Sequence, residues 1–313
     1  MTTPELLDRW ITAGDLPGGV GWSRAQSCWE ATVYFLRERR ANLSTPEEVG
    51  RFFDVLDCLS LMKNPPADTI LELLHPYLEE SSSESLRCKA MRTLCWMRHP
   101  SAVPALLRCF GTESDEHVTS DLQKALGWLK AREAIPRLVK NARIQKSHWI
   151  RTSACQALGR IGGTEAVAHL RELYAHEKNE EVRVEAAIGL ARNGETDVFE
   201  HLEKTFSGSD PSLARDVADH WLERGDVKTL DRVLLRMMPH PEQWGGWIFT
   251  LQSHFPQMPQ VDATLLISPM VKFKPRYVRR SLRWLERHRP HLRWDPERKG
   301  YVTPHLPMPA VED

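Results

Sequence analysis

Four side chains suited to molecular recognition recur along this sequence at one constant interval, namely Trp96, Trp128, Arg160 and Arg192. Tryptophan and arginine are enriched among the side chains that dominate protein–protein binding. Arg92 and Lys124 stand one helical turn before the two tryptophans, and this spacing permits cation–π contacts. We interpret the set as a binding stripe, and the alternative is that each tryptophan fills a seam between helices while the arginines lie along the surface.

A second candidate surface lies near the C-terminus. Residues 275–289 are expected to form a helix, whose apolar positions Val278, Leu282 and Leu285 have helical spacing. The rest of its surface carries five arginines, Arg276, Arg279, Arg280, Arg283 and Arg287. The aromatic residues interleaved with this basic patch are Tyr277, Trp284, Trp294 and Tyr301. Such a surface suits nucleic-acid phosphates and bases, an acidic protein surface, or a charged cap that keeps a helical stack soluble.

The sequence contains no constellation that announces a reaction. Gly-x-Ser-x-Gly and Walker A motifs are absent, and the 13 histidines have neither HExxH nor HxH spacing. The six cysteines lack CxxC spacing and fall mostly among apolar residues, where cysteine acts as a small core side chain. We therefore predict no catalytic residues, no metal site and no cofactor, and we favour a protein that is not an enzyme.

The elements that carry these residues follow the same 32-residue period. Leucines recur at 94, 126, 158 and 190, and a second leucine column recurs at 74, 106, 138, 170 and 202. The spacing within each copy predicts two amphipathic helices, separated by breakers such as Gly162-Gly163 and Asn193-Gly194. No segment shows a sustained period of two, so we predict an all-α solenoid of about six stacked helix pairs and no sheet.

The period also predicts the domain organisation. Residues 1–48 form an N-terminal helical cap with a helix over 23–40, and residues 49–237 form the solenoid. Residues 238–303 form a basic, aromatic-containing helical cap, and residues 304–313 an extended or disordered tail. One helix pair cannot bury its own apolar face, so both ends of such a stack require caps.

Two segments carry a family resemblance. Residues 153–162 (SACQALGRIG) and 182–190 (VRVEAAIGL) resemble short HEAT repeats of the kind named for phycobilisome lyases, and the resemblance covers about residues 49–237. This repeat serves bilin lyases, hydroxylases, DNA-repair proteins and scaffolds, so it implies the fold without the function.

Two kinds of functional site are known in proteins with this repeat, and the sequence can be compared with each. The hydroxylases hold iron with His-Glu pairs, and the matching positions here are Cys88-Lys89, Thr152-Ser153 and Val184-Glu185, which excludes that chemistry. The DNA glycosylases use tryptophans with a carboxylate, whereas Asp121 lies at the other end of the helix that carries Trp128. A glycosylase site is therefore poorly supported.

Composition limits the partners and the location. Apolar residues make up 41% and charged residues 27%, with a net charge of zero, so the whole chain is not a general polyanion binder. Residues 1–83 carry a charge balance of −6 and residues 272–301 one of +8. We expect no signal peptide, no membrane span and a reduced cytoplasmic protein.

We predict a cytoplasmic adaptor or scaffold that binds a partner protein on the concave face of the solenoid. The alternatives are a nucleic-acid binder or DNA-repair factor that uses the basic patch and the Trp/Arg stripe, and a bilin lyase-like chaperone. Neither the partner nor the oligomeric state follows from the sequence.

Overall fold

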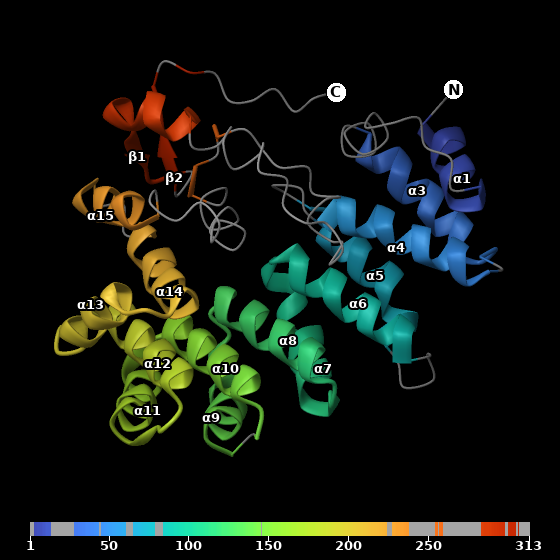
Figure 1. The fold of residues 1–313 in the computed structure, drawn as a ribbon. Coiled ribbons are helices and arrows are strands. Elements are labelled where there is room, and N and C mark those ends of the chain that lie inside the picture. Colours follow the sequence, from blue (N-terminus) through green and yellow to red (C-terminus); the bar gives the residue numbers. More distant parts are fainter. Residues whose placement is uncertain are drawn as a thin grey trace. The chain divides into compact units, whose positions relative to one another are not determined.

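The computed structural model describes residues 3–13, 28–43, 45–60, 65–78, 84–144, 146–223, 227–237, 254–255, 257–258, 283–297, 300–304 and 306. The chain divides into two compact units, Met1–Glu195 (unit 1) and Thr196–Glu312 (unit 2), and each is described by itself. Figure 1 shows that the described part of each unit is mainly helical, which confirms the all-α prediction.

Unit 1 begins with α1 (Thr3–Ala13) and α3 (Trp29–Arg40), which pack on the following helix pair. The first helices of the successive pairs are α4 (Pro46–Ser60), α6 (Glu84–Met97), α8 (Glu116–Trp128), α10 (His148–Ile161) and α12 (Glu180–Arg192). The second helices are α5 (Ala67–Leu78), α7 (Val103–Thr112), α9 (Ile135–Ile144) and α11 (Gly163–His176). Single 3-10 turns, Pro100–Ala102 and Arg132–Ala134, precede α7 and α9.

The two sets of helices form two rows. Each first helix from α4 to α12 packs directly on the first helix of the next pair, whereas α9 and α11 touch far less closely. Helices that approach most closely lie on the shorter side of a curved stack. We call the first helices the inner row and the second helices the outer row, and Figure 1 shows α9 and α11 at the outer margin of this unit.

The leucines that recur every 32 residues form the buried core of unit 1. Leu94, Leu126, Leu158 and Leu190 of the inner row are fully buried. Leu74, Leu106, Leu138 and Leu170 of the outer row are fully buried as well. Each buried leucine contributes about 1.5–3 kcal/mol of hydrophobic free energy. The periodic columns are therefore the residues that hold neighbouring pairs together.

Glycines let α10 and α12 approach backbone to backbone. A Cβ atom added at Gly159 would lie 2.5 Å from the Cα atom of Gly189, and one added at Gly127 on α8 would lie 2.6 Å from the Cα atom of Ala157. The Asn193 side chain donates hydrogen bonds to the carbonyl oxygens of Gly159 (3.0 Å) and Gly189 (2.7 Å), which ties the ends of α10 and α12 together. The C-terminal ends of α8, α10 and α12 are thus held unusually close.

Unit 2 contains α13 (Phe199–Ser207), α14 (Pro211–Leu222) and α15 (Val227–Met237). Leu202, which continues the second leucine column, is fully buried. Arg232 of α15 lies against the rings of Phe206 and Trp221, and it pairs with the Glu203 carboxylate. The Asp210 carboxylate accepts hydrogen bonds from the first amides of α14 and so begins that helix.

The expectation of no sheet is wrong at one place. Strands β1 (Arg293–Asp295) and β2 (Gly300–Val302) form a short antiparallel hairpin that pairs Trp294 with Tyr301. The Tyr301 ring is fully buried and stacks on Phe255 at 5.4 Å between ring centroids. Tertiary burial of one aromatic ring therefore stabilises strands that are too short to show a period in the sequence.

Two predicted terminal helices are only partly described. The N-terminal one begins at Trp29, and residues 23–27 of the predicted range lie outside the described residues. Of the predicted helix over 275–289, residues 283–288 are helical and are followed by a 3-10 turn, Arg289–His291, while 275–282 lie outside the described residues. Among the helices that the structure describes, none has the length and apolar character that crossing a membrane requires.

Candidate partner-binding surface

The four residues of the predicted stripe lie at corresponding places on the inner row. Trp96 and Trp128 stand at the C-terminal ends of α6 and α8, and Arg160 and Arg192 at the ends of α10 and α12. We call these four residues the ladder. Trp96 is 39% exposed and Trp128 is 41% exposed, so both indole rings are accessible from water. Arg160 and Arg192 are half-buried.

Two arginine side chains lie against the indole ring of Trp128. The guanidinium carbon of Arg160 lies 3.6 Å from its ring centroid, and the guanidinium carbon of Arg98 lies 4.7 Å from it. The Gly127–Ala157 approach holds α8 and α10 close enough for the first contact. The structure thus brings together two predicted residues, Trp128 and Arg160, and adds Arg98, which the sequence analysis did not name.

The two predicted cation–π pairs have different outcomes. Arg92 lies over the Trp96 ring at 5.7 Å, as the i,i+4 spacing predicts. Lys124, however, places its ammonium group 5.5 Å from the ring centroid of Trp149 at the start of α10, instead of over Trp128. Trp149 is 50% exposed and also contacts the His117 ring edge-on at 5.9 Å. The aromatic partner of Lys124 is therefore on the neighbouring helix α10, whereas the sequence predicted Trp128, one turn along α8.

Both missed residues stand in columns of the repeat. Trp149 follows His117 by one full repeat, so the two occupy equivalent places on α10 and α8, where their rings meet. Arg98 belongs to the column that ends the inner helices. Aligning the copies beyond the apolar columns would have identified both positions, although not their contacts.

The column of Arg98 has an unusual backbone conformation. Arg98 (φ 45°), Lys130 (φ 53°), Gly162 (φ 68°) and Gly194 (φ 89°) all adopt a positive φ, one in each of four consecutive repeats. Glycine adopts this conformation freely, whereas a residue with a Cβ atom loses about 1–2 kcal/mol there. Two copies therefore place a strained cationic residue where the other two have glycine. A positive charge at a helix C-terminus recovers part of this cost.

Three cations of this surface lack acidic partners. Within the described residues, no carboxylate lies at ion-pair distance from Arg92, Arg98 or Lys124, whose contacts are with indole rings. Partial burial also lowers the pKa of Arg98 below its usual range, because neighbouring atoms displace water from the guanidinium group. The surface thus presents exposed indole rings beside three cations that form no ion pair, of which Arg92 lies near the carboxylates of Asp54 and Asp57.

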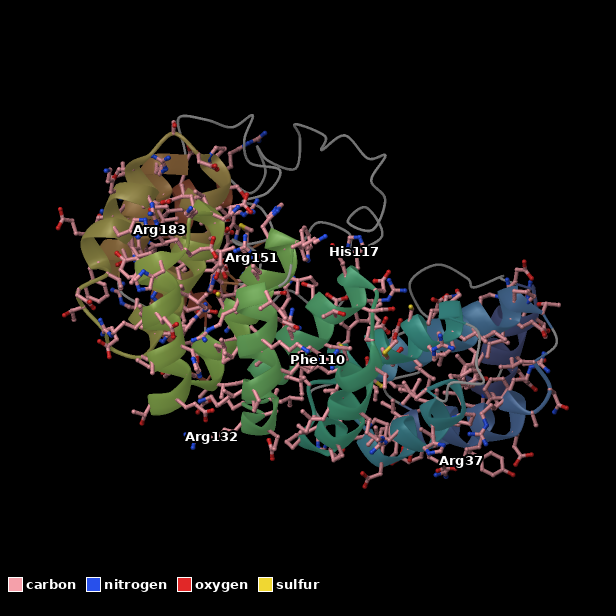
Figure 2. The ribbon with its side chains drawn as sticks, turned by 90° about the horizontal axis from the view of Figure 1, so that it is seen from below. Arg37, Phe110, His117, Arg132, Arg151 and Arg183 are labelled. Atoms are coloured by element: carbon pink, nitrogen blue, oxygen red, sulfur yellow. The ribbon has the colours of Figure 1, made fainter. Side chains whose placement is uncertain are left out.

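Several arginines elsewhere in unit 1 are paired. Arg143 binds the Glu172 carboxylate, Arg151 binds Glu177 and Arg183 binds Glu180. Figure 2 shows Arg151 and Arg183 along one edge of the stack together with His117, and Arg132 at the opposite edge. Arg151 and Arg183 thus bind acids that lie near the starts of the inner helices.

Of the predicted basic patch, the structure places two residues. Arg283 and Arg287 are exposed on the helical segment 283–288, whereas Arg276, Arg279 and Arg280 lie outside the described residues. Leu285 is buried, as its apolar spacing predicts.

The aromatic residues near the patch are largely engaged with one another. Trp284 contacts Phe255 and His288, and Trp294 contacts Tyr301 edge-on. Because Tyr301 is fully buried, it is not available to stack on a base. The adjacent Arg289 binds the Asp231 carboxylate at 2.9 Å.

No cluster of three or more His, Cys, Asp or Glu side chains suited to a metal ion occurs in the described part of the chain. Of the thiols, those of Cys95 and Cys155 are buried, and burial raises their pKa well above the usual range. Such thiols are poor nucleophiles, because the thiolate is the reactive form.

Stacked helix pairs with periodic buried columns define this chain as an α-solenoid protein. Residues 71–154 and 145–223 match the family model for HEAT repeats. The chain is a HEAT-repeat protein, as the resemblance of its repeats implied. No curated protein sequence matches it.

Solved structures with a similar course of the chain include three of low identity. The complex of CpcE and CpcF of phycocyanin lyase from Nostoc sp. PCC7120 is 21% identical over 73% of this chain and 79% of that one, with a TM-score of 0.42. An engineered protein is 17% identical over 91% and 78%, with a TM-score of 0.43. Human deoxyhypusine hydroxylase in complex with glycerol is 16% identical over 92% and 97%, with a TM-score of 0.25. These likenesses are too distant to transfer a function.

Proposed function

We propose that this protein is a non-enzymatic adaptor that binds a partner protein through the inner row of unit 1. The observation that carries the proposal is the exposure of three tryptophans, Trp96, Trp128 and Trp149, on consecutive helices of that row. A soluble protein seldom leaves several large aromatic rings in water on one surface unless they meet a partner. Tryptophan and arginine are also enriched among the few residues that supply most of the binding energy in protein interfaces.

The scaffold suits this role mechanically. The buried leucine columns and the close approach of α8, α10 and α12 hold the exposed rings on packed helices. Rings that are already in place lose little conformational entropy when they bind. The free thiols of Cys88, Cys95, Cys109 and Cys155 are compatible with a reducing compartment, which supports a cytoplasmic location.

The sharpest test replaces both ladder tryptophans by alanine. In the double variant Trp96→Ala and Trp128→Ala, we expect the partner to be lost, because two of the three exposed indole rings of the surface are removed. We expect the free energy of unfolding to fall by about 1–2 kcal/mol, since both rings are partly exposed, compared with about 3–5 kcal/mol for a core tryptophan. The measurements are affinity capture from lysate of the source cells, followed by calorimetric titration of the purified pair, and urea unfolding.

Two control variants make the result decisive. Ile144→Ala removes an apolar side chain that is more exposed than either tryptophan but belongs to the outer row, and capture should persist. Trp221→Ala removes a buried tryptophan of unit 2 and calibrates the stability loss of a core ring. If the double variant loses as much stability as Trp221→Ala and still captures the same protein, the tryptophans are core residues and the proposal is wrong.

A further inference from the structure

Arg98 is the residue of this surface that the fold itself does not require. The same column holds glycine at Gly162 and Gly194, which adopt a positive φ without the steric cost of a Cβ atom. Lys130 also has a positive φ, but Arg98 differs because its guanidinium lies over the indole ring of Trp128 on α8, the next helix of the inner row. A strained backbone that positions a side chain in this way is typical of a functional site.

The geometry around Trp128 prepares hydrogen-bond donors for an anion. The guanidinium groups of Arg98 and Arg160 both lie against the indole ring, at 4.7 Å and 3.6 Å. A guanidinium group held against an aromatic ring keeps its N–H donors, and its fork of donors matches a carboxylate in two parallel hydrogen bonds. Two arginines from α10 and the end of α6 therefore converge on one ring, beside exposed apolar surface.

The charge pattern indicates what kind of anion fits. Arg98 and Lys124 have no carboxylate at ion-pair distance among the described residues, and neither does Arg92, although its charge acts on the nearby Asp54 and Asp57. Residues 1–195 as a whole contain 25 Lys/Arg and 26 Asp/Glu, so the positive charge is local. Asp121 lies on α8 between His117 and Lys124 at helical spacing, where it would repel a continuous polyanion. Separate carboxylates on a protein segment suit this pattern better than a nucleic-acid backbone.

We propose that Arg98 and Trp128, with Arg160 against the same ring, form a receptor for an acidic segment of the partner protein, in which a carboxylate binds the Arg98 guanidinium and apolar side chains pack on the exposed indole rings. This inference rests on the proposed adaptor function and specifies the chemistry of its partner. Arg92 over Trp96 and Lys124 over Trp149 extend the same pairing of a cation with an indole ring to both sides.

The test uses a pair of variants with the same backbone effect. Arg98→Gly and Lys130→Gly both release a left-handed residue with a Cβ atom, so both variants should fold. The probe is a fluorescein-labelled peptide in which Glu and Leu alternate, measured by anisotropy with the full-length protein. We expect Arg98→Gly to weaken its binding by about tenfold or more, which is the loss of one charge-assisted contact, and Lys130→Gly to leave the binding within about twofold.

Two further probes identify the ligand class. The matching Gln/Leu peptide tests the requirement for carboxylates, and we expect it to bind at least about tenfold more weakly than the Glu/Leu peptide. A single-stranded oligonucleotide of the same charge tests a nucleic-acid ligand. Equal losses in Arg98→Gly and Lys130→Gly, equal binding of the two peptides, or tighter binding of the oligonucleotide would each overturn the proposal.

The outcome separates this inference from the adaptor function. If Arg98→Gly retains the captured partner while the double tryptophan variant loses it, the inner row binds a protein but not through carboxylates at Arg98. If the double tryptophan variant also retains the partner, the adaptor surface itself has been misplaced.

Discussion

Replacing Gly159 by alanine is expected to lower the free energy of unfolding of unit 1 by about 2 kcal/mol. The added methyl group would lie 2.5 Å from the Cα atom of Gly189, and the obstacle is the backbone of α12, which packs on α10 and α11. α10 and α12 would have to separate, and the hydrogen bonds of Asn193 to both glycine carbonyls would lengthen. The higher helix propensity of alanine recovers about 1 kcal/mol at most, so the net effect remains destabilising.

The matched control is Gly111→Ala on α7. A Cβ atom there meets nothing within 4 Å, so this variant should gain up to about 0.5–1 kcal/mol from helix propensity alone. Urea unfolding of both variants, followed by far-ultraviolet circular dichroism, measures the two changes. Equal effects of the two substitutions would show that the backbone contact between α10 and α12 is not formed in solution.

Replacing Asp57 by asparagine is expected to stabilise the protein at neutral pH. Burial of this carboxyl group against α6 raises its pKa to about 6, although the hydroxyl of Thr93 donates a 2.5 Å hydrogen bond to it and Arg92 lies nearby. Because the folded state holds the proton more tightly than the unfolded chain, the group favours folding fully at pH values below about 4. This contribution is lost as the pH rises through about 6, at a cost on the order of 3 kcal/mol.

The difference between wild type and Asp57→Asn isolates this group from the other carboxylates. Asparagine keeps an oxygen that accepts the Thr93 hydrogen bond but carries no charge. The variant should therefore match wild type near pH 4 and exceed it by about 1–3 kcal/mol at pH 7.5. The measurement is chemical unfolding across this range.

A second variant checks the direction. In Thr93→Val, the hydrogen bond that favours the ionised carboxylate is absent, so the pH at which stability falls should move upward. A Thr93→Val profile that moves downward, or an Asp57→Asn variant that is less stable than wild type at pH 7.5, would show that Asp57 is not buried as described.

The repeat and its core were predictable because they depend on local periodicity. Leu94 and Leu126 recur one repeat apart, and each belongs to an apolar helical stripe that a stack of helices must bury. The Arg92–Trp96 contact was predictable for the same reason, since both residues lie on one helix a turn apart. The β1–β2 hairpin was not, because its very short strands show no period and depend on the burial of Tyr301.

The ladder of Trp96, Trp128, Arg160 and Arg192 depends both on the repeat in the sequence and on the tertiary packing of the helices. Its repetition, and hence its alignment on one row of helices, follows from the sequence alone. Tertiary structure decided the contacts, because the distance between neighbouring helices depends on which backbones can touch. Gly127 allows the close approach of α8 and α10 that brings Arg160 onto Trp128. The left-handed residue after α6 then adds Arg98, whose place in the repeat the sequence shows but whose contact with Trp128 it does not.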